Sequence, residues 1–312
     1  MPLFSKNKFP VDGRVAVITG GSQGMGKSVA ILLAQRGAHV AIIARNPAKL
    51  DSALEEIRAA RRSAEQKVFL YSADLTRGGE AAAALAAVQA ELGTPDIVWT
   101  CAGGTQPGYF KDYSSAALER EIGINYFTVM HTAHAALRLM TSAGATEDGR
   151  KRHIVFTSSV LAFYPIAGYN SYSPAKAAIR ALADGLRQEC LLYDIDVHAC
   201  FPATIYSPGF EEEQKTKPEL TKILEGSDEG QTPQQVAEEC LKGLERGEAL
   251  VTTTLMGSVI RGSAWGGSPK GFFDTLFAMV LVLVWSVVGR VVDGDVVKYK
   301  KKLEKEGKAD GK

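Results

Sequence analysis

A short apolar run that leads directly into a glycine-rich turn is the feature that most limits how this chain can fold. Residues 15–19 read Val-Ala-Val-Ile-Thr, the pattern of a strand buried on both faces. The turn follows at once as residues 20–27, Gly-Gly-Ser-Gln-Gly-Met-Gly-Lys, and helical spacing continues from Ser28 to Arg36. Strand, glycine turn and helix in this order are typical of a dinucleotide-binding unit, because the turn lets a pyrophosphate approach the helix N-terminus. The alternative is a flexible glycine turn with no ligand.

The residue that follows the next predicted strand is basic. The strand covers His39–Ala44, and Arg45 comes directly after it. Dinucleotide folds often place an acid here to bind the ribose 2′-hydroxyl, whereas a basic residue suits a 2′-phosphate. Arg45, supported by Lys49 and Lys27, therefore indicates NADPH rather than NADH. The alternative is a solvated charge where the next helix begins.

Strand-like and helical stretches alternate through most of the chain. This order predicts an α/β fold with a doubly wound parallel sheet of Rossmann type. A further helix is expected to begin after Thr232, which suits an N-cap and is followed by a proline. The other predicted strands are residues 68–72, 97–100, 153–157, 196–200 and 250–253, and the other helices are residues 47–64, 79–92 and 118–140.

The overall composition excludes some classes of function. Hydrophobic residues make up 46% of the chain and charged residues 23%, and a net charge of +1 argues against nucleic-acid binding by bulk charge. The four cysteines are scattered without a C-x-x-C pair, so we expect a reducing compartment and no metal site. Residues 1–10 are too polar and too short for a secretory signal, which predicts that the bulk of the chain faces the cytosol.

Tyr172 and Lys176 lie four residues apart and are expected to share one face of a helix. Pro174 fits only the first turn of a helix, so Tyr172 should stand near its start. A nearby ammonium lowers the pKa of a phenol from its usual value of about 10, which makes the phenol a usable proton donor near neutral pH. Ser159 follows strand 153–157 and can reach the same carbonyl as Tyr172. The alternatives are an exposed Tyr–Lys pair and turn-forming serines.

Several of these stretches occur together, in the same order, in one known family. They are Thr19-Gly20-x-x-x-Gly24-x-Gly26, Cys101-Ala-Gly103, Asn125, Ser159 and Tyr172-x-x-x-Lys176. On these motifs the chain resembles the short-chain dehydrogenase/reductase family over roughly residues 12–255. The resemblance implies that Tyr172 donates a proton to a carbonyl oxygen that Ser159 orients, with Ser158 as a less favoured substitute. It also implies that Lys176 lowers the pKa of Tyr172 and holds the nicotinamide ribose, and that Asn125 holds a water connecting Lys176 to solvent.

The same resemblance implies where a dinucleotide cofactor lies, although two positions depart from the family pattern. Ala203 replaces a usual glycine, and Thr100-Cys101 stands where many members have two asparagines. The implied cofactor residues are Gly20, Ser22, Gln23, Gly24, Met25 and Gly26 around the pyrophosphate, Arg45 and Lys49 at the 2′-phosphate, Asp74 and Leu75 near the adenine, Tyr172 and Lys176 at the nicotinamide ribose, and Ile205 and Ser207 at the carboxamide.

An apolar stretch near the end of the chain is not needed for this fold. Residues 275–289 are fifteen residues without a charge, which at ~1.5 Å per residue is shorter than a ~30 Å hydrocarbon core. Residues 298–302 beyond it are rich in lysine, and a single span would carry them to the far side against the positive-inside tendency. We therefore expect a shallow or re-entrant membrane anchor over residues 271–292. The alternative is a core or dimer-interface helix.

These features predict two parts of the chain, a reductase domain over residues 1–268 that binds NADPH and an apolar, membrane-associating segment with a basic tail over residues 269–312. Residues 211–230 are polar and are expected to form a lid over the substrate, and the alternative is an exposed pair of helices without that role. The family often forms dimers through its long helices, so a homodimer is possible.

Within the family, the glycine turn, the basic pair Arg45 and Lys49, residues 207–218 and the apolar tail are most similar to the 3-ketodihydrosphingosine reductases. The similarity implies that NADPH reduces 3-ketodihydrosphingosine to dihydrosphingosine in sphingolipid synthesis, at the endoplasmic reticulum membrane with the catalytic domain facing the cytosol. One alternative keeps the chemistry and changes the substrate to a steroid, a retinoid or a 3-ketoacyl chain. Another is a membrane scaffold that binds NADPH without turnover.

Overall fold

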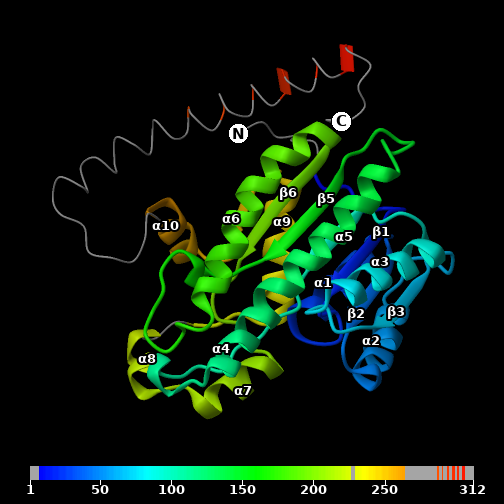
Figure 1. The fold of residues 1–312 in the computed structure, drawn as a ribbon. Helices are drawn as coiled ribbons and strands as arrows, with labels where there is room; N and C mark the ends of the chain where they lie inside the picture. Colours follow the sequence, from blue (N-terminus) through cyan, green and yellow to red (C-terminus); the bar gives the residue numbers. More distant parts are fainter. Residues whose placement is uncertain are drawn as a thin grey trace.

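The computed structural model of the chain describes residues 7–225 and 229–263, with isolated positions between residues 287 and 305. A sheet of seven parallel strands forms its centre (Figure 1), and going across the sheet the order is β3-β2-β1-β4-β5-β6-β7. The strands are β1 (Val15–Thr19), β2 (His39–Ala44), β3 (Val68–Ser72), β4 (Ile97–Thr100), β5 (Arg152–Thr157), β6 (Ile195–Phe201) and β7 (Leu250–Thr252).

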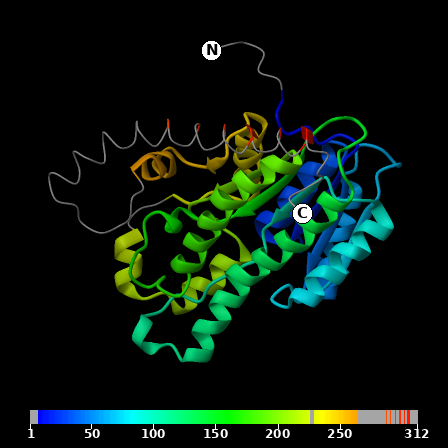
Figure 2. The same ribbon diagram turned by 45° about the horizontal axis from the view of Figure 1, so that its top comes forward.

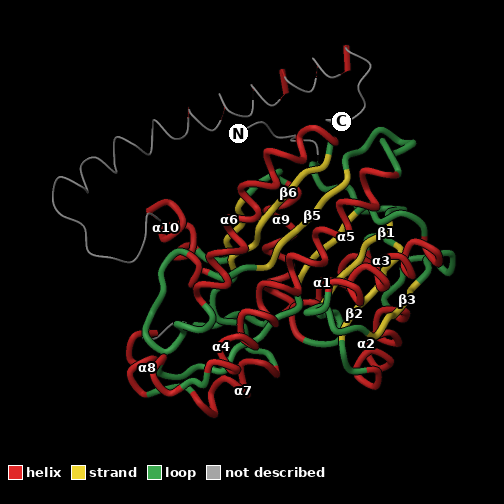
Figure 3. The backbone as a smooth tube through the Cα atoms, in the orientation of Figure 1, coloured by secondary structure: helices red, strands yellow, loops and turns green. Residues whose placement is uncertain are grey.

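Helices cover both faces of this sheet, as the tube in Figure 3 and the turned view in Figure 2 show. The six longest helices of the described residues contribute buried side chains to two separate clusters, one on each face. One face carries α1 (Gly24–Gln35), α2 (Pro47–Ala59) and α9 (Pro233–Glu245), and the other carries α3 (Gly78–Leu92), α5 (Thr128–Ser142) and α6 (Ser173–Glu189).

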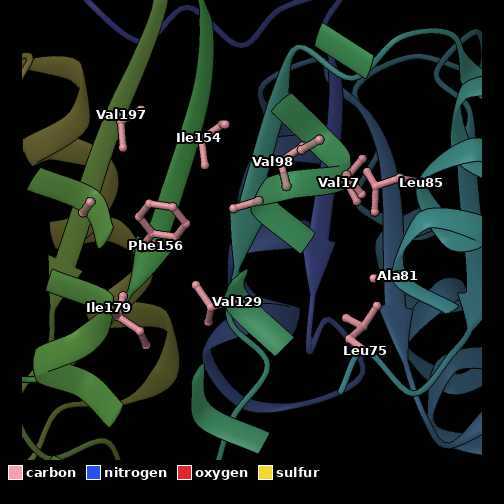
Figure 4. Close-up of a cluster of buried hydrophobic side chains, with 14 of the residues drawn as sticks. Val17, Leu75, Ala81, Leu85, Val98, Val129, Ile154, Phe156, Ile179 and Val197 are labelled. Atoms are coloured by element: carbon pink, nitrogen blue, oxygen red, sulfur yellow. The ribbon is translucent and has the colours of Figure 1, made fainter. Parts of the chain in front are cut away.

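Alternating side chains of the strands supply the two clusters. Val15 and Val17 of β1 point to the face of α3, α5 and α6, and Ala16 and Ile18 point to the face of α1, α2 and α9. Figure 4 shows the first cluster, in which Val17 lies among side chains from neighbouring strands and helices. Both faces are apolar because both are covered, which is why these strands read as continuous apolar runs in the sequence.

The predicted doubly wound parallel sheet is confirmed. Four of the predicted strands, β1 to β4, have the same bounds in the structure. The strand order reverses between β1 and β4, which are neighbours although two strands separate them in the chain. Open α/β sheets bind ligands outside the carboxyl ends of the strands at such a reversal.

The helix boundaries differ from the predictions most clearly in three places. Helix α1 begins at Gly24, four residues before the predicted start, so the last glycines of the turn belong to its first turn. Helix α2 ends at Ala59 rather than residue 64. There the side chain of Gln66 accepts hydrogen bonds from the backbone N–H groups of Arg62 and Ser63, and this turn replaces further helix.

The predicted helix over residues 118–140 is longer and is interrupted. It consists of α4 (Ser115–Ile122), a π-helical turn η2 (Gly123–Phe127) and α5. The π turn contains Asn125, and such turns often occur at functional sites.

The predicted polar lid forms two short helices after β6. These are α7 (Pro208–Thr216) and α8 (Glu219–Glu225), and together with α4 they gather at one end of the sheet in Figure 1. Helix α9 begins as predicted, because Thr232 and Gln235 form a reciprocal capping box. The remaining elements are α10 (Leu255–Ser263) and the 3₁₀ turns η1 (Phe110–Asp112), η3 (Val160–Ala162) and η4 (Cys190–Tyr193).

The predicted apolar anchor over residues 271–292 and the boundary after residue 268 lie outside the described residues, apart from two isolated positions. Within the part of the chain that the structure describes, no helix combines the length and the apolar character that crossing a membrane requires.

Candidate active site

One cleft at the carboxyl edge of the sheet collects nearly all the predicted site residues. It runs from the ends of β1 and β2, past the ends of β4 and β5, to α7 and α8. Of the sixteen predicted catalytic and cofactor residues, Asn125 alone does not line it. The predicted residues that line it are Gly20, Ser22, Gln23, Gly24, Met25, Gly26, Arg45, Lys49, Asp74, Leu75, Ser159, Tyr172, Lys176, Ile205 and Ser207.

The glycine turn forms a cradle that larger residues would fill. Gly20 has a φ of +66°, and a Cβ there would lie 2.8 Å from the backbone of Ala102 at the end of β4. A Cβ on Gly26 would collide with the carbonyl oxygen of Gly20. The bare backbone and the N-terminus of α1 therefore suit the close approach of a pyrophosphate group.

The end of the cleft beside β2 is basic. Arg45 and Lys49 both line it, and the ammonium of Lys49 donates to the side-chain oxygen of Gln23 at 2.8 Å. Lys27 does not share this position. Its ammonium lies 2.8 Å from the carboxylate of Glu56, and Lys27 does not line the cleft. The prediction that Lys27 assists Arg45 at a 2′-phosphate is therefore wrong.

Ser159, Tyr172 and Lys176 come together at the middle of the cleft. Tyr172 precedes the first residue of α6, as Pro174 in the first turn predicts. Its hydroxyl shares a hydrogen bond with the hydroxyl of Ser159. The Lys176 ammonium lies 5.3 Å from the centre of the Tyr172 ring and donates to the carbonyl oxygen of Thr157 at 3.1 Å. A ketone oxygen beside the two hydroxyls can therefore accept hydrogen bonds from both.

The two adjacent serines have different partners. Ser158 is buried, and its hydroxyl donates to the carbonyl oxygen of Lys176 at 2.8 Å, which ties the end of β5 to α6. Ser159 lies on the cleft beside Tyr172. The geometry favours Ser159 over Ser158 as the group that orients a substrate.

Asn125 lies beneath the cleft in the π turn. Its amide nitrogen donates to the carbonyl oxygens of Gly104 at 2.7 Å and Glu121 at 3.0 Å, and its oxygen accepts from the Gly104 N–H at 3.2 Å. A Cβ on Gly103 would lie 3.0 Å from this oxygen and 3.6 Å from the Lys176 ammonium, so the two side chains meet at Gly103. Asn125 thereby holds the loop after β4 against the lysine.

The predicted lowering of the Tyr172 pKa is wrong for the protein alone. Burial raises the pKa of Tyr172 above its ordinary value, the Glu213 carboxylate raises it further, and the Ser159 hydrogen bond only partly opposes them. Burial also lowers the pKa of Lys176 from 10.5 to about 8. The phenol keeps its proton at neutral pH, and the phenolate that forms after proton donation depends on the nearby charged lysine.

Several polar side chains at the far end of the cleft are not among the predicted site residues. They include Glu121, Tyr169, Glu213, Lys217 and Glu225. Helix α7 ends at Thr216, and the ammonium of Lys217 contacts the Glu225 carboxylate at 2.9 Å. Only the tertiary arrangement of α4, α7 and α8 brings these groups to Tyr172.

A group of potential metal ligands lies apart from the cleft. Within the described ranges, His153, Asp196 and His198 are the residues close enough to share an ion, and they sit near the amino ends of β5 and β6. Internal contacts already engage them, because the two histidine rings share a 3.3 Å hydrogen bond and Asp196 pairs with Lys151 at 2.9 Å.

Known proteins are similar to this chain in amino-acid sequence. Residues 14–218 match the family model described as short chain dehydrogenase. A 3-ketodihydrosphingosine reductase of Aspergillus fumigatus is 42% identical over 305 residues, which cover 90% of this chain and 83% of that protein. A 3-ketodihydrosphingosine reductase of Neurospora crassa is 39% identical, with 96% and 86% covered, and one of Cryptococcus neoformans var. neoformans is 36% identical, with 99% and 91% covered.

Solved structures match the fold. A short-chain type dehydrogenase/reductase from Mycobacterium ulcerans is 25% identical and superposes with a TM-score of 0.67 over 78% of this chain and 89% of that chain. A short-chain dehydrogenase/reductase from Burkholderia phymatum, solved in complex with NAD, is 19% identical with a TM-score of 0.69 over 82% and 94%.

The lowered pKa of Lys176 predicts a descending limb in the pH profile. We expect the rate of carbonyl reduction to fall as pH rises through about 8, because the ammonium is charged below that pKa and neutral above it. Steady-state rates at saturating cofactor between about pH 6 and pH 10 measure it. In the variant Lys176→Arg the limb should disappear, since a guanidinium keeps its charge. A wild-type rate that stays level over this range contradicts the prediction.

Proposed function

Because the chain belongs to the short chain dehydrogenase family, we propose that it uses NADPH to reduce the ketone of 3-ketodihydrosphingosine to the alcohol of dihydrosphingosine. The observation that carries the proposal is the convergence of Ser159, Tyr172 and Lys176 on one cleft that also contains the glycine cradle. Relatives that carry this substrate in their names cover nearly the whole chain.

The residues of the cleft have separate roles in this reaction. When bound, a reduced nicotinamide supplies the hydride that adds to the carbonyl carbon. The Ser159 hydroxyl donates a hydrogen bond to the ketone oxygen and holds it beside Tyr172. The Tyr172 hydroxyl gives its proton to this oxygen, and the charged Lys176 then stabilises the phenolate. One hydride and one proton together convert the ketone to a secondary alcohol.

NADPH is preferred over NADH in this proposal because of the basic end of the cleft. Arg45 stands at the end of β2, where the 2′ position of an adenine ribose lies in dinucleotide folds, and Lys49 is close by on α2. Charge-assisted hydrogen bonds from these residues to a 2′-phosphate favour the phosphorylated cofactor.

The proposed function predicts NADPH oxidation by the purified protein with 3-ketodihydrosphingosine, with dihydrosphingosine identified by mass spectrometry. Tyr172→Phe should lower kcat by at least about 100-fold, because the proton donor is lost, and should leave NADPH binding largely intact. Tyr109→Phe is the matched control, since Tyr109 is exposed and lies outside the cleft lining.

Two results contradict this proposal. A steroid, retinoid or 3-ketoacyl substrate that is reduced while 3-ketodihydrosphingosine is not would assign the chemistry to another ketone. Absence of NADPH oxidation with every ketone tested would leave a binding protein without turnover.

The cofactor proposal predicts a change of preference in Arg45→Glu. The variant should lose about 10- to 100-fold in kcat/KM for NADPH and gain relative activity with NADH, because a carboxylate repels the 2′-phosphate and accepts from a 2′-hydroxyl. Arg58→Glu is the control, as Arg58 lies on α2, the helix that follows Arg45, and is outside the cleft lining. An unchanged ratio of the two cofactors in Arg45→Glu rules out this role.

We further propose that residues 271–292 bind the protein to the membrane of the endoplasmic reticulum and that the cleft faces the cytosol. The uncharged run within these residues supports an anchor, and a long-chain ketone is itself a membrane lipid. Carbonate extraction of membranes containing the full-length chain should leave the protein in the pellet, and a chain ending at residue 268 should be released. Release of the full-length chain contradicts the anchor.

A further inference from the structure

The far end of the cleft has the opposite charge to the end beside β2. Glu121 from α4, Glu213 from α7 and Glu225 from α8 all line it. Figure 1 shows these three helices together at one end of the sheet. The basic end at Arg45 suits a phosphate, and the acidic end beyond Tyr172 suits a cation.

One of these carboxylates is already neutralised. Both oxygens of Glu225 accept from the buried Lys217 ammonium at 2.9 Å, and one also accepts from the Tyr169 hydroxyl at 2.7 Å. Glu213 is held less firmly. Among the described residues its side chain accepts one long hydrogen bond, from the Tyr169 hydroxyl at 3.4 Å. The single positive charge of Lys217 pairs with Glu225 and only partly offsets the negative charge of Glu213.

Glu121, the third carboxylate, is buried, and one of its two oxygens is unpaired within the described residues. Glu121 is 3% exposed, lines the cleft, and its Oε2 atom has no hydrogen-bond partner within the described part of the chain. Thr105 and Gln106 lie beside this carboxylate and favour its charged form, but burial outweighs them, so a cation in the cleft would stabilise the unpaired oxygen. Burial raises the pKa of Glu121, and it raises the pKa of Glu213 to about 7.

Both acids act on the same catalytic hydroxyl. Glu213 accepts from the Tyr169 hydroxyl, and the Tyr169 ring centre lies 6.0 Å from that of Tyr172. Glu121 lines the same cleft, and the negative charges of both acids raise the pKa of Tyr172. In the proposed substrate the carbon next to the ketone carries an amino group. A ketone oxygen that meets Ser159 and Tyr172 therefore leaves this amine within reach of groups that surround Tyr172.

We infer that Glu213 and Glu121 bind the protonated amine beside the ketone of the substrate, an inference that rests on the proposed function. The two carboxylates make the site selective for an amino ketone over ketones of similar length without an amine. A neutral ketone leaves Glu121 and Glu213 unpaired in the cleft, and this desolvation cost opposes its binding. Steroids, retinoids and 3-ketoacyl chains lack the cation that the acidic end requires.

The test compares two ketones that differ only in the amine. One is 3-ketodihydrosphingosine, and the other is the same ketone with hydrogen in place of its amino group. We expect wild-type kcat/KM to favour the amino ketone by about 10- to 100-fold, and Glu213→Gln to remove most of this preference by lowering the value for the amino ketone alone. Glu212→Gln is the matched control on α7, where Glu212 is exposed and pairs with Lys215, and it should keep the wild-type preference.

The outcomes separate this inference from the proposed function. The inference is overturned if the wild-type enzyme reduces both ketones equally well, or if Glu213→Gln lowers kcat/KM by the same factor for both ketones. Either result leaves the reductase function standing. A wild-type enzyme that reduces only the ketone without the amine overturns both. If Glu213→Gln does not fold, as judged by NADPH binding, Glu121→Gln decides by the same ratio, since removal of its charge should lower the preference in the same direction.

Discussion

The parallel register of the seven strands is the constraint on which the whole site depends. Because every strand runs in the same direction, every carboxyl end meets at one edge, and residues far apart in the chain become neighbours there. The glycine turn follows β1, Arg45 follows β2, and Ser159 follows β5 within two residues. Burial of both faces holds the register, since a slip by one residue would exchange the two apolar clusters. The chemistry therefore rests on packing that lies entirely outside the cleft.

Burial at the floor of the cleft shifts the pKa values of the catalytic groups in opposite directions. The same burial lowers the pKa of Lys176 and raises that of Tyr172, because in each case it disfavours the charged form. The ion pair that forms when Tyr172 has lost its proton is poorly solvated, and the remaining hydrogen bonds must hold it. The Thr157 carbonyl oxygen accepts a hydrogen bond from the Lys176 ammonium, and the Ser159 hydroxyl forms a hydrogen bond with Tyr172. Lys176 and Tyr172 are therefore both oriented before a substrate arrives.

Much of the fold could be predicted because local patterns decide it. The strands β1 to β4 are short, mainly apolar runs, and their bounds could be predicted from the sequence alone. The end of α2 could not be predicted, because it depends on a side chain, Gln66, that folds back onto the helix end. The π turn at Asn125 is likewise invisible in helical spacing, since it adds no break in polarity. In the cleft, the motif residues could be found by spacing, whereas the acids of α4 and α7 meet only through tertiary packing.

The acidic end also bears on why the raised pKa of Tyr172 does not prevent proton donation. Glu213 and Glu121 both disfavour the phenolate while they are unpaired. A cation bound between them offsets their negative potential at the Tyr172 oxygen and so lowers the cost of forming the phenolate. An amino ketone thus brings with it part of the positive charge that the reaction needs, in addition to that of Lys176. A ketone without the amine leaves the two carboxylates opposing the proton transfer, so selectivity appears in the chemical step as well as in binding.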